Sequence, residues 1–164
     1  PIGGSPGVDL ITDAKIALLR RHDIRRISMG VQSTQAHQLK ILGRGHTREE
    51  ALDVIQLIKG EGFALNIDMM YRLPGQRVDE VRLDLDDVVG RGIDHMSWFP
   101  YVPHEGTSLA RRIDKGRVDA QAGRADYRAM FEASLQHSFA HCPCGGIVAA
   151  PHGRPPRILH HIAN

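Results

Sequence analysis

The sequence has 164 residues, of which 41% are hydrophobic and 24% charged, which is ordinary for a globular domain with a core of its own. Its 21 basic and 19 acidic residues are mixed along the chain, so the net charge of +2 indicates no general attraction to nucleic acid. No apolar run approaches the roughly 18 residues of a membrane-spanning helix, and no signal peptide opens the chain, so we expect a cytoplasmic protein that contacts no membrane.

The first predicted elements are a helix over residues 13–21, a strand over 26–31 and a helix over 35–42. Thr12 or Asp13 is the expected N-cap of the first helix, whose apolar residues near one side are Ile16, Leu18 and Leu19. A capping box at residues 47–50 then opens a third helix that runs to about residue 60. The residues that recur at helical spacing in it, and so predict its buried face, are Ala51, Val54, Ile55 and Ile58.

The chain continues with a strand over residues 64–70, a turn at 73–75, a helix over 78–89 and a strand over 94–99. A further helix begins near Thr107, and residues 120–137 carry another helical pattern. The repeated order of strand, loop and helix predicts an α/β fold, a parallel sheet with helices outside it. We assign residues 1–137 to this domain and residues 138–164, which are rich in Pro, Gly and His, to an irregular tail.

Ligands of such folds bind at the C-terminal ends of the parallel strands. Small or polar residues follow all three predicted strands, in the segments 30–33, 66–68 with 73–76, and 97–102. Glycine lets the backbone approach a ligand closely, and an amide or carboxylate can bond hydroxyl or amino groups. The residues alone therefore predict a ligand site at this edge of the sheet, without naming the ligand.

Four strings resemble consecutive signatures of the oxygen-independent coproporphyrinogen III oxidase family. They are RISMGVQSTQAHQLKILGR with His46, NIDMMYRLPGQ from residue 66, DHMSWFPY from residue 94 and EGTSL from residue 105. Each string alone is weak evidence. The four occur in order and with the family's spacing over roughly residues 5–118, which together indicates homology.

This resemblance implies a partial (β/α) barrel of the radical S-adenosylmethionine type, with parallel strands and outer helices. In that family a reduced [4Fe–4S] cluster cleaves S-adenosylmethionine to a 5′-deoxyadenosyl radical, which abstracts a hydrogen from a small-molecule substrate. In the porphyrinogen enzyme the outcome is decarboxylation of propionate side chains, a step of porphyrin and haem biosynthesis. The implied partners are a tetrapyrrole substrate and a reductant protein for the full-length enzyme.

Carried over position by position, Gln32, Arg44 and Asp68 match family residues that contact S-adenosylmethionine, and Val102 matches a position whose backbone lines the same site. Asp68 would accept hydrogen bonds from ribose hydroxyls or the ammonium group, and Arg44 would pair with the methionyl carboxylate, while Gln32 can donate and accept. Each residue also has a simpler interpretation. Gln32 could cap a helix, Arg44 could be a solvated arginine, and Asp68 could be a buried acid bonded to backbone amides. We identify no catalytic residue.

The sequence also departs from the family pattern. The cluster motif CxxxCxxC is absent, and the two cysteines, Cys142 and Cys144, are too few for such a cluster or for a four-cysteine zinc site. Arg72 stands where the family usually has glycine, and Arg77 where it usually has threonine. We therefore expect a chain that begins inside the barrel, contains no cluster ligand and is inactive without the cluster segment.

Two alternatives remain. One branch of the family is thought to traffic haem rather than oxidise porphyrinogen, so the chain could be a haem-binding or haem-trafficking relative. It could also be an unrelated small α/β domain with a zinc-binding tail, built from His and Cys at positions 137, 141, 142, 144, 152, 160 and 161, although their spacing fits no finger pattern. Trp98, Phe99 and Tyr101 could stack on a flat macrocycle or pack in the core, and we interpret Met69 and Met70 as core residues.

Overall fold

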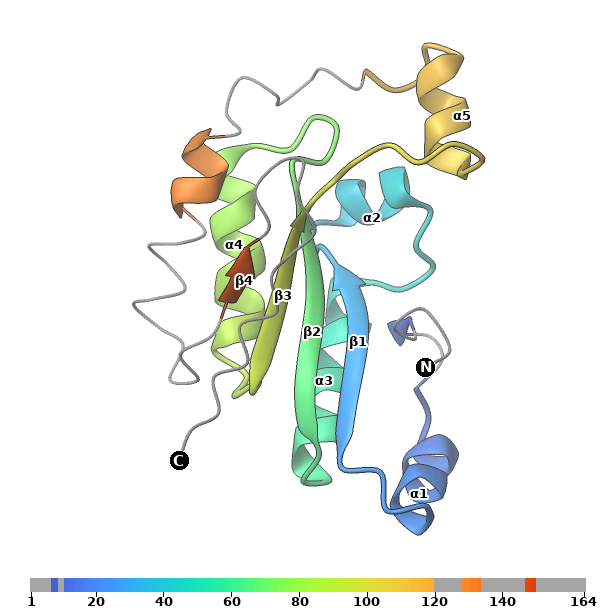
Figure 1. Ribbon diagram of the computed structural model, residues 1–164, viewed down its shortest axis with the longest axis vertical. Helices are drawn as coiled ribbons and strands as arrows, with labels where there is room; N and C mark the ends of the chain where they lie inside the picture. Colours follow the sequence, from blue (N-terminus) through green and yellow to red (C-terminus); the bar gives the residue numbers. More distant parts are fainter. Residues whose placement is uncertain (1–6, 9–10, 120–127, 134–146, 150–164) are drawn as a thin grey trace.

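The computed structural model describes residues 7–8, 11–119, 128–133 and 147–149. Its centre is a parallel sheet of strands β1 (Arg26–Gln32), β2 (Ala64–Tyr71), β3 (His95–Pro100) and β4 (Ile147–Ala149), in the order β1-β2-β3-β4 (Figure 1). All four strands end at the same edge because they are parallel. The predicted α/β fold, a parallel sheet with outer helices, is confirmed.

The helices are α1 (Asp13–Arg21), α2 (Ala36–Leu42), α3 (Arg48–Gly60), α4 (Val78–Val89) and α5 (Ser108–Asp114), and residues 128–133 are also helical. Helix α3 connects β1 to β2 and α4 connects β2 to β3, and both lie behind the sheet in Figure 1. None of the helices in the described part of the chain is long and apolar enough to span a membrane.

The core lies between the sheet and helices α3 and α4. Alternate strand residues point to this face, since successive side chains of a strand point to opposite sides. Met69 is buried there as expected, whereas Met70 is only half-buried. Trp98 is fully buried and stacks on Tyr71 with ring centroids 5.7 Å apart and planes within 5°. Trp98 is therefore a core residue and not part of an exposed stacking platform.

Helix α1 begins after Thr12, whose hydroxyl accepts a hydrogen bond from the Lys15 amide, so the predicted N-cap is confirmed. The prediction is wrong for one residue of the apolar face of α1. Ile16 is buried and Leu19 packs against the core, but Leu18 is 50% exposed. Positions three apart share a helix face and positions two apart do not, so Leu18 points away from Ile16.

Helix α3 begins with the predicted capping box. The Glu50 amide donates to the Thr47 hydroxyl over 3.2 Å, and the Thr47 amide donates to the Glu50 carboxylate over 2.7 Å. These two bonds satisfy backbone donors that a helix start otherwise leaves unpaired. The predicted buried face is also confirmed, with Ala51, Ile55 and Ile58 fully buried and Val54 packed at its margin.

The departures at positions 72 and 77 have visible structural consequences. Arg72 has φ +61°, in the left-handed region where glycine is favoured. Arg77 is the N-cap of α4, and its amide donates to Glu80 over 2.8 Å. Its guanidinium cannot accept a bond from the helix amides and instead pairs with Asp79 over 2.7 Å. The chain therefore keeps the family turn and helix start without the residues best suited to them.

Replacing Arg72 by glycine is expected to raise the free energy of unfolding by about 0.5–1 kcal/mol, because relief of the left-handed backbone exceeds the entropic cost of glycine. Urea denaturation measures the change. Arg72→Ala is the matched control, since alanine removes the same side chain but keeps the backbone strain. Equal stabilities of the glycine and alanine variants would show that relief of the backbone strain does not exceed the entropic cost of glycine.

The last predicted segments are described only in part. Of residues 120–137, predicted to be helical, residues 128–133 are described and are helical, with Met130 and Ala133 buried. Of residues 138–164, predicted to be irregular, only Ile147–Ala149 are described, and they form a strand paired with β3 between Met96 and Trp98. The boundary between a domain and a tail near residue 137 stays a prediction. The His and Cys residues of the zinc hypothesis lie outside the described residues.

Candidate functional site

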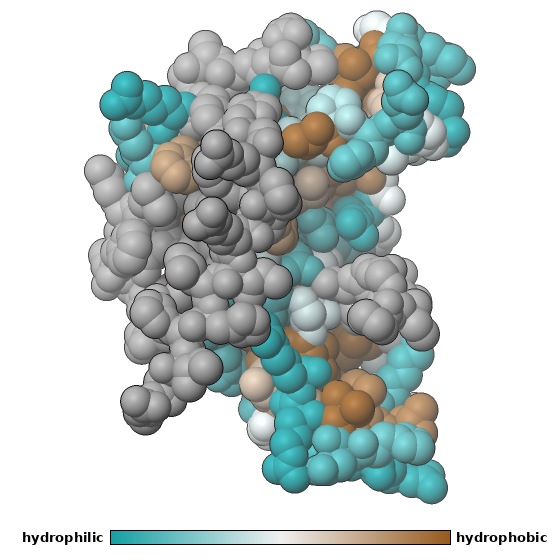
Figure 2. Space-filling view, in the orientation of Figure 1, coloured by the Kyte–Doolittle hydropathy of each residue, from teal (hydrophilic) through white to brown (hydrophobic). Residues whose placement is uncertain are grey.

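The face of the sheet opposite α3 and α4, called the open face below, carries two polar rows. Strand register aligns Ser28, Asn66 and His95 in one row. The next row toward the C-terminal edge contains Gly30, Asp68 and Ser97. The open face is turned to the viewer in Figure 2, where hydrophilic and hydrophobic side chains are both visible beside the grey atoms. We call Ser28, Asn66, Asp68, His95 and Ser97 the polar cluster.

Asn66 is the centre of the polar cluster. It is 3% exposed, and its amide nitrogen donates to Ser28 Oγ over 2.7 Å and to Asp68 Oδ1 over 2.8 Å. Its amide oxygen lies 2.5 Å from His95 Nδ1 and accepts from Ser97 Oγ over 3.2 Å. A buried amide with all its hydrogen-bonding positions used is held rigidly. Asn66 therefore sets the orientation of both ionisable groups beside it.

The two ionisable groups of the cluster are half-buried and differ in character. Burial lowers the pKa of His95, and the charge of Arg26 lowers it further, against a smaller opposing effect of Asp68. His95 is consequently neutral near pH 7. Asp68 accepts from Asn66 and, over 3.5 Å, from Ser28 Oγ. Both of these bonds come from side chains, whereas the simpler interpretation of Asp68 was an acid bonded to backbone amides.

Gln32 and Asp68 lie on neighbouring strands near the C-terminal edge. Asp68 pairs with Gly30, and Gln32 pairs with Met69 across a bulge. Gln32 has φ +75°, which is strained for a residue other than glycine. Strain at the end of a strand persists only where the surrounding structure holds it.

The other two predicted residues lie farther along the chain from these strands. Val102 is 44% exposed and follows β3 at the same edge, where the Tyr101 amide donates to the Tyr71 carbonyl over 2.7 Å. Arg44 is exposed just after α2, and its amide donates to the Leu39 carbonyl. No hydrogen bond or ion pair described between residues 11 and 119 joins Arg44 to Gln32, Asp68 or Val102. A common cofactor site for all four residues stays a prediction.

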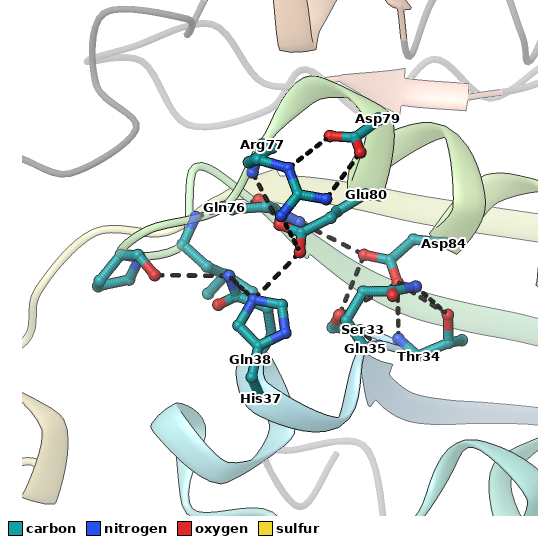
Figure 3. Close-up of polar contacts among 12 residues, drawn as sticks. Ser33, Thr34, Gln35, His37, Gln38, Gln76, Arg77, Asp79, Glu80 and Asp84 are labelled. Atoms are coloured by element: carbon teal, nitrogen blue, oxygen red, sulfur yellow. Dashed lines mark hydrogen bonds and ion pairs between the residues drawn. The ribbon is translucent and has the colours of Figure 1, made fainter.

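A second polar network holds the loops at the C-terminal edge, and sequence reasoning missed it. Asp84 of α4 is fully buried, and Figure 3 shows it pointing toward the segment that follows β1. Its carboxylate accepts from the Thr34 amide over 2.7 Å, from the Thr34 hydroxyl over 2.8 Å and from the Ser33 hydroxyl over 3.0 Å. Gln35 and Gln76 also donate to it, over 3.3 and 3.4 Å.

The Asp84 network joins two segments that are far apart in sequence. Ser33 and Thr34 follow Gln32 directly, and Gln76 comes from the loop after β2, where it also accepts from the Leu73 amide over 3.2 Å. Burial raises the pKa of Asp84 to about 6, although bonds from Thr34, Gln35 and Ser33 lower it. The position of Asp84 between the buried residues Val81, Leu85 and Val88 was the available sequence signal.

The sequence-family model of the Radical SAM superfamily matches residues 2–88, which is more than half of the chain. The chain belongs to the radical SAM superfamily. Its relatives include the heme chaperone HemW of Mycobacterium tuberculosis, 34% identical over 63% of this chain and 27% of that protein. The oxygen-independent coproporphyrinogen-III oxidase-like protein HemZ of Bacillus subtilis is 31% identical over 81% of this chain and 26% of that protein. The chain thus spans about a quarter of the length of these curated relatives.

Solved structures agree on the fold. Elp3 of the archaeon Methanocaldococcus infernus superposes with a TM-score of 0.70 at 20% identity, over 88% of this chain and 33% of that one. Coproporphyrinogen III oxidase HemN of Escherichia coli superposes with a TM-score of 0.65 at 23% identity, over 82% of this chain and 30% of that one. This radical SAM chain is therefore a relative of the HemW and HemZ proteins, as the sequence strings predicted, and it shares the fold of HemN.

The radical SAM superfamily uses S-adenosylmethionine and a [4Fe–4S] cluster, and the polar cluster fits the first of these. A half-buried carboxylate on the open face suits ribose hydroxyls or an ammonium group, because an ionised carboxylate only accepts. The iron–sulfur cluster has no matching ligands here. The 164 residues contain two cysteines, fewer than CxxxCxxC requires, and the described residues contain no group of three His, Cys, Asp or Glu arranged to hold a metal.

Proposed function

We propose that this chain is the S-adenosylmethionine-binding part of a radical SAM protein that binds haem or a related tetrapyrrole. The observation that carries the proposal is the Asp68 carboxylate, held by Asn66 on the open face next to the C-terminal edge of a parallel sheet. Ligands of parallel α/β sheets bind at that edge. The names of the HemW relatives, heme chaperones, support haem binding or trafficking.

In this proposal the residues of the chain bind and orient. Asp68 accepts hydrogen bonds from the ribose or ammonium group, and Asn66 keeps its carboxylate turned to the open face. Gln32, which directly precedes the Ser33 and Thr34 that donate to Asp84, supplies an amide at the edge of the same site. Asp68 and Gln32 would hold S-adenosylmethionine, which would supply the radical chemistry of the superfamily only with a [4Fe–4S] cluster, for which these 164 residues contain no CxxxCxxC motif.

The resemblance to coproporphyrinogen oxidases supports a second function, the oxidative decarboxylation of a porphyrinogen. HemZ, which is named an oxygen-independent coproporphyrinogen-III oxidase-like protein, aligns with 81% of this chain. Both functions place a tetrapyrrole beside the cofactor. They differ in whether the bound tetrapyrrole is changed. A porphyrinogen whose propionates stay intact when S-adenosylmethionine, a reductant and a cluster-bearing segment are all supplied therefore favours the carrier.

The first test is the binding of S-adenosylmethionine to the purified chain, measured by isothermal titration calorimetry. Asp68→Asn is expected to weaken binding about tenfold or more, since a hydrogen bond to a charged group contributes about 1.5–3 kcal/mol. Asp53→Asn, an exposed aspartate of α3, is the matched control and should bind like the wild type. Equal affinities of Asp68→Asn and the wild type would remove Asp68 from the cofactor site.

A further inference from the structure

The hydrogen bonds of the polar cluster determine which way the Asn66 amide faces. One of its terminal atoms lies 2.8 Å from a carboxylate oxygen of Asp68. An ionised carboxylate only accepts, so this atom is the amide nitrogen. The amide oxygen therefore faces His95 and Ser97, which are 2.5 and 3.2 Å away.

This orientation also determines the tautomer of His95. An amide oxygen accepts, so the His95 Nδ1 facing it carries a hydrogen. A neutral imidazole with its hydrogen on Nδ1 has a lone pair on Nε2. No hydrogen bond to Nε2 is described among residues 11–119, and His95 is half-buried on the open face. Among these residues the lone pair therefore has no donor, so it can accept a bond from a ligand.

The remaining donors of the cluster point inward. Both hydrogens of the Asn66 amide are used by Ser28 and Asp68, and the Ser97 hydroxyl donates to Asn66. The proposed function assigns the Asp68 carboxylate to S-adenosylmethionine, so the acceptor that the cluster offers a second ligand is His95 Nε2. Such a site selects a ligand group that accepts an electron pair, either an N–H group or a metal centre.

Arg26 adds the opposite charge to one end of this site. It is exposed on β1 two positions before Ser28, so both residues belong to the same face of the strand. Burial is the larger cause of the lowered pKa of His95, and the positive charge of Arg26 is the second cause. A guanidinium beside a neutral imidazole suits a ligand with carboxylates around an electron-accepting centre. Tetrapyrroles with propionate side chains have this chemistry.

We propose that His95 is a further ligand-contacting residue, held by Asn66 so that Nε2 contacts the centre of a bound tetrapyrrole, with Arg26 facing its carboxylates. The proposal rests on the proposed function, because it assumes that a tetrapyrrole binds the open face. It assigns the ligand contact to His95 and makes Asn66 its positioning residue. The contacted group is either the pyrrole N–H of a metal-free ring or the iron of haem.

The test compares haem with metal-free protoporphyrin, the same ring with and without iron, by absorbance titration of the full chain. His95→Asn is the key variant, because its amide nitrogen can still donate to Asn66 while the Nε2 lone pair is gone. We expect it to weaken binding about tenfold, and His22→Asn, an exposed histidine at the end of α1, to bind like the wild type. Loss confined to haem identifies iron as the contacted group, whereas loss with the metal-free ring identifies N–H.

Failure of this inference is distinguishable from failure of the proposed function. If the wild type binds either ring and His95→Asn binds it equally well, His95 is not a contact and the inference is overturned. If the wild type binds neither ring, the proposed function fails, and the inference with it. Long-range ¹H–¹⁵N spectra of the imidazoles give an independent measurement on the free protein. A hydrogen on Nε2 instead of Nδ1 overturns the assigned tautomer whatever the titrations show.

Discussion

Replacing Asp84 by alanine is expected to lower the free energy of unfolding at pH 5 by about 3 kcal/mol, since it leaves several buried donors without their acceptor. These donors include the Thr34 amide and the Ser33 hydroxyl, both buried and within 3.0 Å of the carboxylate. At pH 5 the carboxyl group, with a pKa of about 6, is largely neutral in the folded protein. At this pH the Asp84→Ala variant therefore loses hydrogen bonds, and it gains nothing from removing a buried charge because the carboxyl group carries little charge.

Urea denaturation followed by circular dichroism measures this change. Asp53→Ala is the control, because Asp53 is also a helical aspartate but is exposed on α3. It should change the free energy of unfolding by less than about 0.5 kcal/mol. A loss of similar size in both variants would show that the Asp84 network does not stabilise the fold. A selective loss with weaker S-adenosylmethionine binding would connect the network to the position of Gln32.

The second large effect is the pH dependence that Asp84 confers. Its pKa is about 6 in the folded protein against 3.8 for an ordinary aspartate, so the folded state keeps the proton to higher pH. The stability that this group contributes is therefore greatest below about pH 4 and is lost as the pH rises to about 6. The difference corresponds to about 3 kcal/mol.

The measurement is the free energy of unfolding of wild type and Asp84→Asn at several values between pH 4 and 7. The asparagine side chain stays neutral, so the wild type should lose stability relative to it as the pH rises, and the difference should level off above about pH 6. Asp87 has the opposite tendency. Partial burial raises its pKa, but hydrogen bonds from Arg48 and Thr34 lower it overall. Its contribution cancels when the two proteins are compared, and a flat difference would show that Asp84 is ionised throughout.

The Asp84 network and the polar cluster connect different parts of the site. The Asp84 network joins the segment after β1 to α4 and to the loop after β2, so it positions backbone around the C-terminal edge. The polar cluster joins the three strands themselves and presents acceptors on the open face. A rigid support behind a ligand-contacting residue is what a precise binding site requires. Variants of the two networks should therefore differ, since Asp84 acts through stability and His95 through ligand affinity.

Most of the local structure could be predicted from the sequence. The capping box at Thr47, the spacing of Ala51, Ile55 and Ile58 and the bounds of α4 depend on residues three or four apart. Such contacts form within one helix and leave a readable period. The family strings added the superfamily, which is confirmed, and one of these strings contains Asp68. Leu18 was misplaced because a short helix with three clustered apolar residues leaves its facing side ambiguous.

What the sequence by itself determined was therefore the order of elements, their caps and the family. Only the tertiary structure decided the long-range partners of Asn66, Asp84 and His95, because the bonds of Asp84 to Ser33 and Thr34 and of Asn66 to His95 join residues 51, 50 and 29 positions apart. Strand register aligns Asn66 with His95, and a shift by one residue would turn His95 to the other face. The strand Ile147–Ala149 is a similar case, since three residues have little preference of their own and pair only where the edge of β3 is available.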